Sequence, residues 1–192
     1  MEKIMGLLRV RVMKGINLAV RDVKSSNPYV VLTMGEQGSI CISMSQASCN
    51  CKEKLYNPHL FRLKTRVIDN NLNPVWNEEL TFSIAPPILP VKLNVYDKDT
   101  FTKDDKMGEA VFEIQTLIEC ARLNLEGVPS GAVIRTVAPS EHNCLAEESL
   151  ICRTDGKVIQ DLRLRLRNVE CGEVELQLEW IIVPGSMGIQ MP

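Results

Sequence analysis

Alternating apolar and polar residues recur along the chain and predict β-strands over most of its length. Leu8, Val10 and Val12 alternate with arginines, and leucines alternate with arginines over residues 162–166. A period of two places the apolar side chains on one face of a strand. Eight runs of this kind predict eight strands, over residues 8–12, 29–34, 63–68, 79–84, 91–96, 108–114, 162–166 and 173–182. Short strands separated by turn residues are typical of an antiparallel β-sandwich.

Helical periodicity is confined to one segment, residues 116–125, where apolar side chains recur on one face. We expect this helix between the sixth and seventh strands, inside a long connection at 115–160. A second long stretch, 38–62, is rich in Ser, Cys and Asn and joins strands that a short turn could connect. We therefore predict one domain over residues 1–183, with an insert at 38–62, and a C-terminal tail at 184–192.

Composition and charge exclude several classes of function. The 192 residues include 22 Lys and Arg against 24 Asp and Glu, a formal net charge of −2, so no basic face is expected to bind nucleic acid. No segment supplies the roughly 18 consecutive apolar residues of a membrane-spanning helix. Arg9 and Arg11 interrupt the apolar run that a signal peptide requires. The seven cysteines, an odd number, favour free thiols in a reducing compartment.

The densest cluster of charged residues follows the fifth predicted strand. Asp97, Asp99, Asp104 and Asp105 lie within nine positions. Clustered carboxylates repel each other unless a cation neutralises them, and Ca²⁺ takes about six to eight oxygen ligands. A solvated acidic loop with lysine counter-ions is the alternative, and this loop alone does not separate the two. Asp104 fits the ligand spacing less well than Asp105, and we expect it to be a solvated charge.

A second acidic loop, at residues 21–30, extends the pattern. Its order of motifs resembles the C2 domain, a calcium- and phospholipid-binding β-sandwich. The matching stretches are Ser26-Asn27-Pro28-Tyr29-Val30, Asn73-Pro74-Val75-Trp76-Asn77-Glu78, and Asp97-Lys98-Asp99 through Asp105-Lys106-Met107-Gly108. The resemblance implies an all-β fold, an eight-stranded antiparallel C2 β-sandwich with a helix-containing insertion between strands six and seven.

The chain also resembles a plant subfamily, the C2-domain abscisic-acid-related proteins. The resemblance covers nearly the whole chain except 38–62, and its specific stretches lie at 125–131, 143–149, 155–157 and 169–174. It implies a calcium-dependent phospholipid-binding adaptor that recruits abscisic-acid receptors to membranes and stimulates a GTPase. We therefore expect a peripheral protein of the plasma membrane, present also in cytoplasm and nucleus, whose partners are anionic phospholipid membranes, the receptors and a GTPase, with no nucleic acid.

The same resemblance implies a set of metal ligands. Asp22, Asp97, Asp99 and Asp105 match ligand positions of the family, and Asn27 stands where the family pattern has a second aspartate of the first loop. Asparagine keeps an oxygen but gives up a negative charge. Because ligand charge helps to set the affinity for Ca²⁺, we expect weaker binding than in relatives that carry aspartate here.

Five residues are candidates for contact with a membrane. Phe101, at the tip of the third loop, either enters a bilayer or folds back onto the sandwich. Lys24 and Lys103 lie on the two predicted metal loops and can meet anionic headgroups, although ordinary solubilising lysines look the same. Lys64 and Arg66 alternate on the third predicted strand, where the family commonly carries a basic groove for phosphoinositides, and two charges make only a thin patch.

Three other functions compete with the calcium adaptor. An enzyme is not expected, because the chain lacks a phosphate-binding Gly-x4-Gly-Lys loop and a Gly-x-Ser-x-Gly nucleophile motif. A C2 domain that has lost calcium and serves as a calcium-independent interaction module is the alternative that Asn27 favours. A zinc site in the 38–62 insert matches no common ligand spacing, and we favour retained intronic sequence or an imperfect gene model as the origin of the insert. Its zinc candidates are Cys41, Cys49, Cys51 and His59.

The long 115–160 connection is the expected docking surface for a protein partner. A minimal sandwich does not need so long a connection, and long ordered loops are often functional. Stimulation of a GTPase would require a group presented to the other protein, such as an arginine finger. The candidates for such a group within 115–160 are Arg122, Arg135 and Arg153, and the sequence does not distinguish among them.

Overall fold

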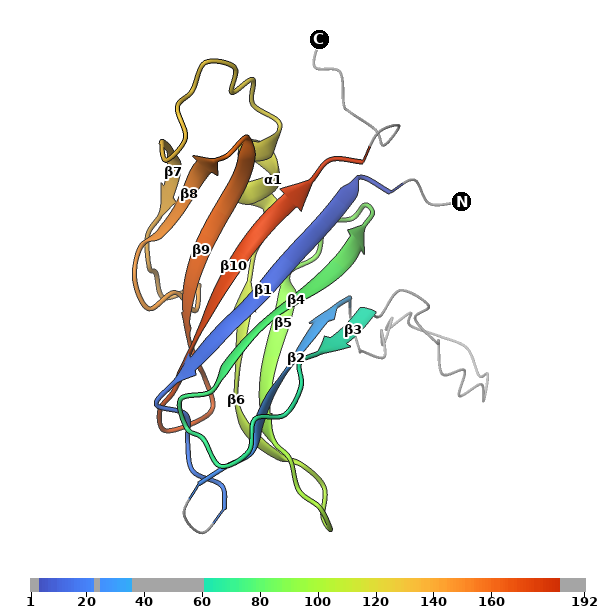
Figure 1. Cartoon of the computed structure of the whole chain (residues 1–192), viewed down its shortest axis with the longest axis vertical. Coiled ribbons are helices and arrows are strands. Elements are labelled where there is room, and N and C mark those ends of the chain that lie inside the picture. Colours follow the sequence, from blue (N-terminus) through green and yellow to red (C-terminus); the bar gives the residue numbers. More distant parts are fainter. Residues whose placement is uncertain (1–3, 23–24, 36–60, 184–192) are drawn as a thin grey trace, which may run out of the picture.

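The computed structural model describes residues 4–22, 25–35 and 61–183 (Figure 1). Lys24 and the four zinc candidates of the insert lie outside these residues. The described residues form ten strands and one helix: β1 (Gly6–Ile16), β2 (Pro28–Met34), β3 (Phe61–Lys64), β4 (Val75–Ile84), β5 (Val91–Asp97), β6 (Asp105–Phe112), α1 (Gln115–Ala121), β7 (Val133–Val137), β8 (Ser149–Thr154), β9 (Lys157–Arg165) and β10 (Glu173–Ile181).

Two antiparallel sheets pack face to face around one core (Figure 1). The larger sheet has the order β4-β1-β10-β9-β8-β7, and the smaller has the order β3-β2-β5-β6. Leu8, Val10 and Val12 of β1 are fully buried, as their period of two predicts. The expected sandwich is confirmed, and α1 lies between β6 and β7 as expected. Within the described residues, no helix is long and apolar enough to cross a membrane.

The strand count is the main correction to the sequence analysis, which expected eight. β7 and β8 lie within the 115–160 stretch that was interpreted as a loop with one helix. β7 is the last strand of the larger sheet, and its burial pattern shows no clean alternation. An edge strand with both faces partly wet carries little apolar periodicity, so the pattern could not reveal it. The 115–160 segment therefore extends the sheet instead of merely connecting its strands.

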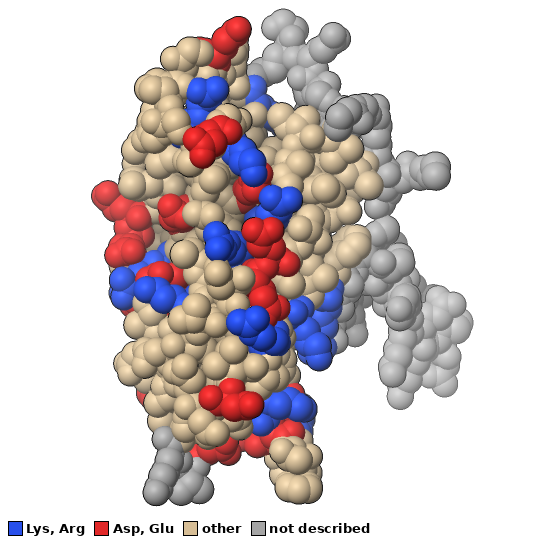
Figure 2. Space-filling model, viewed as in Figure 1, with Lys and Arg blue, Asp and Glu red and all other residues tan. Residues whose placement is uncertain are grey.

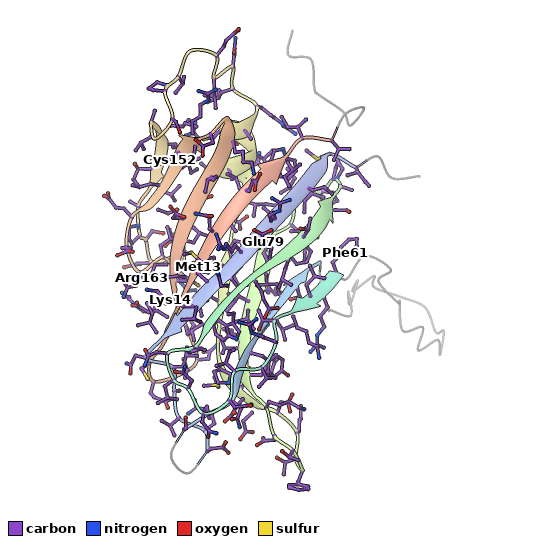
Figure 3. The ribbon with its side chains drawn as sticks, viewed as in Figure 1. Met13, Lys14, Phe61, Glu79, Cys152 and Arg163 are labelled. Carbon is purple, nitrogen blue, oxygen red and sulfur yellow. The ribbon has the colours of Figure 1, made fainter. Side chains whose placement is uncertain are left out.

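The outer face of the larger sheet carries opposite charges in register. Arg9 of β1 lies opposite Glu179 of β10 and pairs with it at 3.0 Å, and its Nε lies 3.6 Å from Glu79 of β4. Lys14 and Arg163 pair with glutamates of β10 in the same way. Lys14, Glu79 and Arg163 are labelled in Figure 3, and Figure 2 shows both signs interspersed over this face. Because the charges are paired, the outer face of the larger sheet has no strong positive or negative electrostatic potential.

The loops that carry the predicted ligands meet at one end of the sandwich, at the bottom of Figure 1. Hydrogen bonds between backbones tie them together: Asn71 donates to the carbonyl of Ser26 at 3.0 Å, and Lys98 donates to the carbonyl of Asn27 at 3.0 Å. The β1–β2, β3–β4 and β5–β6 connections therefore form one unit. This end of the fold positions the candidate site.

Candidate functional site

Asp97, the last residue of β5, lies at the centre of the site. Its side chain is buried, with 1% of the residue exposed. One carboxylate oxygen, Oδ1, accepts the backbone N–H of Asn27 at 2.5 Å, while Oδ2 is buried and has no hydrogen-bond partner among the described residues. An unpartnered buried carboxylate oxygen costs free energy in the absence of a cation. It is also the kind of ligand that a hard cation such as Ca²⁺ requires.

The electrostatics of Asp97 show which other carboxylates surround it. Burial is the largest effect and raises its pKa, and the negative charges of Asp22 and Asp99 raise it further. The hydrogen bond from the backbone N–H of Asn27 and the nearby Ser26 hydroxyl lower this pKa and so act in the opposite direction. Loops far apart in the sequence thus bring carboxylates close enough to disfavour the charge on Asp97.

The remaining predicted ligands lie around this centre. Asp105 begins β6 directly opposite Asp97 in the β5–β6 ladder, and its side chain is exposed. Asp22 is exposed and Asp99 is half-buried. Across the described parts of the chain, no three acidic, histidine or cysteine side chains converge closely enough to hold a metal ion. The fold gathers the predicted ligands at one end but does not close them into a coordination shell, while the unpartnered oxygen of Asp97 fits a cation.

The side chain of Asn27 is hydrogen-bonded to two neighbouring loops and to Asp22 of its own loop. Its Oδ1 accepts the backbone N–H of Asn70 at 3.0 Å, and this bond sets the orientation of the amide. Its Nδ2 donates to Oδ2 of Asp22 at 3.3 Å and to the carbonyl of Lys98 at 3.4 Å. The amide hydrogens of Asn27 therefore face two oxygens. A carboxylate at this position has no hydrogen to donate and would repel both oxygens. Asn27 stabilises the loops in a way that the family's aspartate cannot without a cation.

Asp104 is not the solvated charge that we expected. Its Oδ2 accepts the hydroxyl of Tyr29 at 2.6 Å, and its Oδ1 accepts Nζ of Lys98 at 2.9 Å and the backbone N–H of Asp99 at 3.2 Å. The hydrogen bond from Tyr29, followed by that from Lys98, lowers the pKa of Asp104. Burial and the same bond raise the pKa of Tyr29 to about 12. Asp104 thus fixes the base of the third loop.

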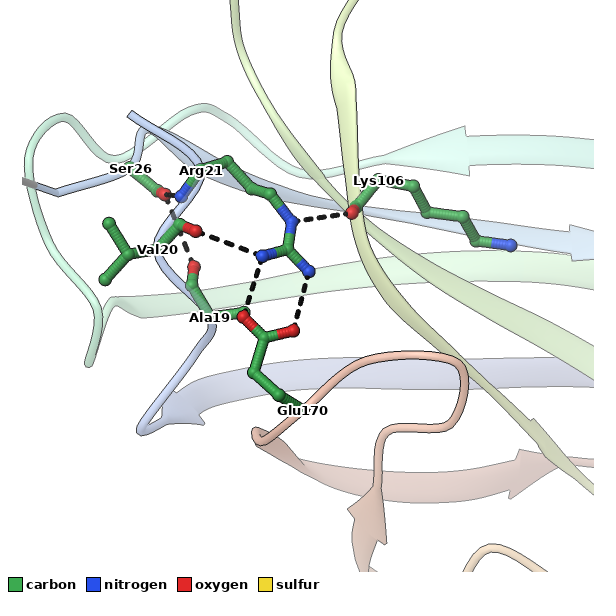
Figure 4. Close-up of polar contacts among 6 residues, drawn as sticks. All are labelled: Ala19, Val20, Arg21, Ser26, Lys106 and Glu170. Carbon is green, nitrogen blue, oxygen red and sulfur yellow. Dashed lines mark hydrogen bonds and ion pairs between the residues drawn. The ribbon is translucent and has the colours of Figure 1, made fainter. Parts of the chain in front are cut away.

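A guanidinium clamp that the sequence did not reveal holds the first loop in place (Figure 4). Arg21 pairs with both carboxylate oxygens of Glu170, at 2.8 and 3.0 Å, and also donates to the carbonyls of Val20 and Lys106. The hydrogen bond from Arg21 lowers the pKa of Glu170 to about 2, so the pair persists to acidic pH. The two residues are 149 positions apart, and no local pattern links them. The clamp joins the β1–β2 loop, the start of β6 and the β9–β10 turn.

The tip of the third loop is exposed. Phe101 has 96% of its surface accessible, so the alternative in which it folds back onto the sandwich is wrong. Lys103 beside it is also exposed. Val20, on the neighbouring loop, is 44% exposed and was missed by the sequence analysis. Two apolar side chains and a lysine therefore lie on the loops at the acidic end of the molecule.

The predicted basic pair on the third strand has two different environments. Lys64 is exposed at the end of β3, whereas the guanidinium of Arg66 donates to the carbonyl of Trp76 at 3.0 Å and lies 3.5 Å from Glu78. Strand register adds two cations that the sequence analysis missed, since Arg62 and Lys92 both lie opposite Thr33 of β2. The outer face of the smaller sheet thus has more positive charge than Lys64 and Arg66 alone provide.

Comparison with known proteins agrees with this arrangement. The family model of the C2 domain matches residues 6–127. The chain is 52% identical to C2-domain ABA-related protein 4 of Arabidopsis thaliana, across 98% of this chain and 93% of that protein. It is 49% identical to GTPase activating protein 1 of Oryza sativa subsp. japonica, across 97% and 98%.

A solved structure supports the fold. Calcium-bound extended synaptotagmin 2, in a structure of its two C2 domains, superposes with a TM-score of 0.56 at 20% identity, covering 95% of this chain and 48% of that chain. A single domain of this kind is a binding module and not a catalyst. The chain belongs to the C2-domain family and, within it, to the plant C2-domain ABA-related proteins.

Proposed function

We propose that the protein is a calcium-dependent phospholipid-binding adaptor. The observation that carries this proposal is the buried, unpartnered oxygen of Asp97 among the carboxylates of Asp22 and Asp99. No described residue forms a hydrogen bond with that oxygen, and a divalent cation would neutralise its charge. Burying an uncompensated carboxylate is costly, so its presence at an exposed loop end favours a binding role over a structural one.

The residues that would hold Ca²⁺ are Asp22, Asp97, Asp99 and Asp105, together with the backbone carbonyl of Lys98. Bound calcium would supply positive charge and open coordination positions for anionic oxygens. Without the ion, the aspartates repel an anionic surface; with it, the local sign reverses. Asn27 would contribute less negative charge than the family's aspartate, so we infer modest affinity.

Membrane contact would follow from the side chains next to these loops. Phe101 and Val20 present apolar surface, and Lys103 presents positive charge at the same end. Lys24 belongs to the first loop, outside the described residues. Each basic side chain near an anionic surface contributes about 1 kcal/mol. The outer face of the smaller sheet, with Lys64 and its neighbours, would add to the attraction as a second basic surface.

The 115–160 segment is the proposed docking surface for abscisic-acid receptors and a GTPase. The name of the relative from Oryza supports a GTPase as a partner, and the name of the relative from Arabidopsis supports a connection to abscisic acid. Among the arginines singled out by sequence, Arg135 pairs with Glu119 and Arg153 donates to a backbone carbonyl, whereas Arg122 lies beside Leu123, which is 50% exposed. We infer that Arg122 and Leu123 lie in the partner surface and that the adaptor works at the plasma membrane, with further pools in cytoplasm and nucleus.

A calcium-independent interaction module is the second candidate, and one observation favours it. The amide of Asn27 already donates hydrogen bonds to Asp22 and to the Lys98 carbonyl. These hydrogen bonds hold two oxygens that a bound cation would otherwise attract. If these hydrogen bonds suffice, the loops are held without metal. The two candidates differ in whether calcium changes stability and lipid binding.

Asp97→Asn is predicted to stabilise the metal-free protein. Burial raises the folded-state pKa of Asp97, so at neutral pH folding disfavours its charge, and this destabilisation disappears as pH falls through the raised pKa. In EDTA at pH 7 we expect the melting temperature to rise by about 2–4 °C, which corresponds to roughly 1 kcal/mol in a domain of this size. Differential scanning calorimetry would measure the change. A lower melting temperature would show that the charge on Asp97 is satisfied within the chain.

Asp97→Asn combined with Asp99→Asn is predicted to abolish calcium-dependent vesicle binding. Co-sedimentation with phosphatidylserine vesicles, in Ca²⁺ and in EDTA, would measure it. We expect the calcium-dependent affinity of the variant to fall by more than about tenfold, equivalent to roughly 1.4 kcal/mol. Asp155→Asn is the matched control, since Asp155 lies in the β8–β9 turn at φ 48°, which asparagine tolerates. Equal binding by the wild type in Ca²⁺ and EDTA would favour the calcium-independent module.

Phe101→Ala is predicted to weaken vesicle binding without changing the melting temperature. Full burial of a phenylalanine side chain contributes about 1.5–3 kcal/mol, and the exposed ring contributes little to the folded protein. We expect about tenfold weaker co-sedimentation and recovery with Phe101→Trp. Phe61→Ala is the control, because Phe61 is 44% exposed on β3, away from the loop tip (Figure 3). Unchanged binding of Phe101→Ala would show that the third loop does not enter the bilayer.

A further inference from the structure

Arg21 lies beside two of the proposed calcium ligands and forms an ion pair with neither. It directly precedes Asp22 in the chain, and its Nε donates to the carbonyl of Lys106, the residue after Asp105, at 3.2 Å. The hydrogen bond to Glu170 raises the pKa of Arg21 most, and the negative charge of Asp105 raises it further. Among the described residues, the guanidinium pairs with Glu170 alone. A positive charge is therefore held next to two metal ligands without binding either.

Glu170 holds the guanidinium of Arg21 in one orientation (Figure 4). Nη1 of Arg21 donates to Oε1 of Glu170 at 2.8 Å, and Nη2 donates to Oε2 at 3.0 Å. Nη1 also donates to the carbonyl of Val20 at 3.0 Å. A guanidinium has five N–H donors, and with the bond to Lys106 four of them are used. Paired hydrogen bonds of this kind fix geometry as well as supplying energy, so Glu170 keeps the group from pairing with the aspartates.

The β9–β10 turn that carries Glu170 is packed directly on β6. Glu109 of β6 and Arg167 of the turn exchange backbone hydrogen bonds, at 3.1 and 2.7 Å. Gly108 has a φ of 120°, and a Cβ at this position would lie 2.7 Å from Cγ1 of Val169. The absence of a side chain at Gly108 thus permits the close approach of the turn. The position of Glu170 is therefore determined by the packing of the two sheets and not by a loose loop.

We propose that Glu170 is a positioning residue that determines the calcium affinity of the site by keeping Arg21 from pairing with the aspartates. The inference rests on the proposed calcium binding. A guanidinium released from Glu170 would pair with Asp22 or Asp105, because it lies next to both and their charges attract it. A cation tethered to the loop would then compete with Ca²⁺ for the same oxygens at high effective concentration. In the described chain Glu170 bonds to no proposed ligand, so it acts through Arg21.

Isothermal titration calorimetry of the full chain with Ca²⁺ tests the role of Glu170. Glu170→Gln should weaken calcium binding about fivefold, the scale of one exposed ion pair. The side chain of Glu170 is 59% exposed, so the change should leave the fold intact. Glu173→Gln is the matched control, because it removes the same charge next to the same turn and releases Arg163 on the outer face of the larger sheet. We expect this control to change the affinity less than about twofold, since exposed charges are screened by salt.

A second substitution separates this role from a purely structural one. Arg21→Gln, added to Glu170→Gln, should tighten calcium binding about fivefold, because the competing guanidinium is gone. In the otherwise wild-type chain, Arg21→Gln should change the affinity less than about twofold, since Arg21 does not pair with the aspartates there. A clamp that only orders the loop would give no tightening in either background, and a general effect of charge would give equal tightening in both. Either result would overturn the proposal.

NMR spectra recorded in EDTA provide a measurement that needs no metal. They would follow the Nε–H of Arg21 and the backbone N–H groups of Asp22 and Asp105. Glu170→Gln should shift all three signals, because the guanidinium moves to the aspartates, and Glu173→Gln should leave them in place. Unchanged signals in Glu170→Gln would show that Arg21 does not depend on Glu170 for its position, and would overturn the proposal.

Failure of the proposed function would give a different result from failure of this inference. A wild-type protein that binds no Ca²⁺ would contradict the calcium-dependent adaptor, and the role of Glu170 in calcium affinity would fall with it. A wild-type protein that binds Ca²⁺ and a Glu170→Gln variant that binds it equally well would contradict the role of Glu170 alone.

Discussion

The buried carboxylate of Asp97 is the interaction on which the binding end of the molecule depends. β5 lies between β2 and β6, so the register places Asp97 beside Pro28 on one side and Asp105 on the other. A residue held in the middle of a sheet cannot turn outward to solvate its charge. The sheet that stabilises the sandwich therefore also buries an oxygen of Asp97 that has no hydrogen-bond partner among the described residues. Binding of Ca²⁺ would offset the free-energy cost of that burial.

The loops around Asp97 are held by protein groups before any ion arrives. Asp104 fixes the base of the third loop through Tyr29 and Lys98, and Arg21 fixes the first loop through Glu170. A preorganised site loses less conformational entropy on binding. Asn27 adds hydrogen bonds among the same loops at the cost of one ligand charge. The affinity of the site for Ca²⁺ thus depends on two opposing effects: the preorganised loops favour binding, and the ligand charge missing at Asn27 disfavours it.

The sequence predicted the fold class, the helix and the loops that hold the acidic residues, because alternation and spacing are local properties. It could not reveal β7, an edge strand whose faces are both partly wet. It also could not pair Arg21 with Glu170, or place Arg62 and Lys92 on one face, since these depend on strand register between distant segments.

The pKa of Asp97, measured by NMR titration with and without Ca²⁺, tests the central claim most directly. In the metal-free protein burial should hold the pKa above its ordinary value, and a bound divalent cation should lower it below that value, because a positive charge favours the carboxylate. The adaptor account predicts this reversal. An Asp97 pKa that is unaffected by millimolar Ca²⁺ would contradict it and would leave the loops as a calcium-independent surface.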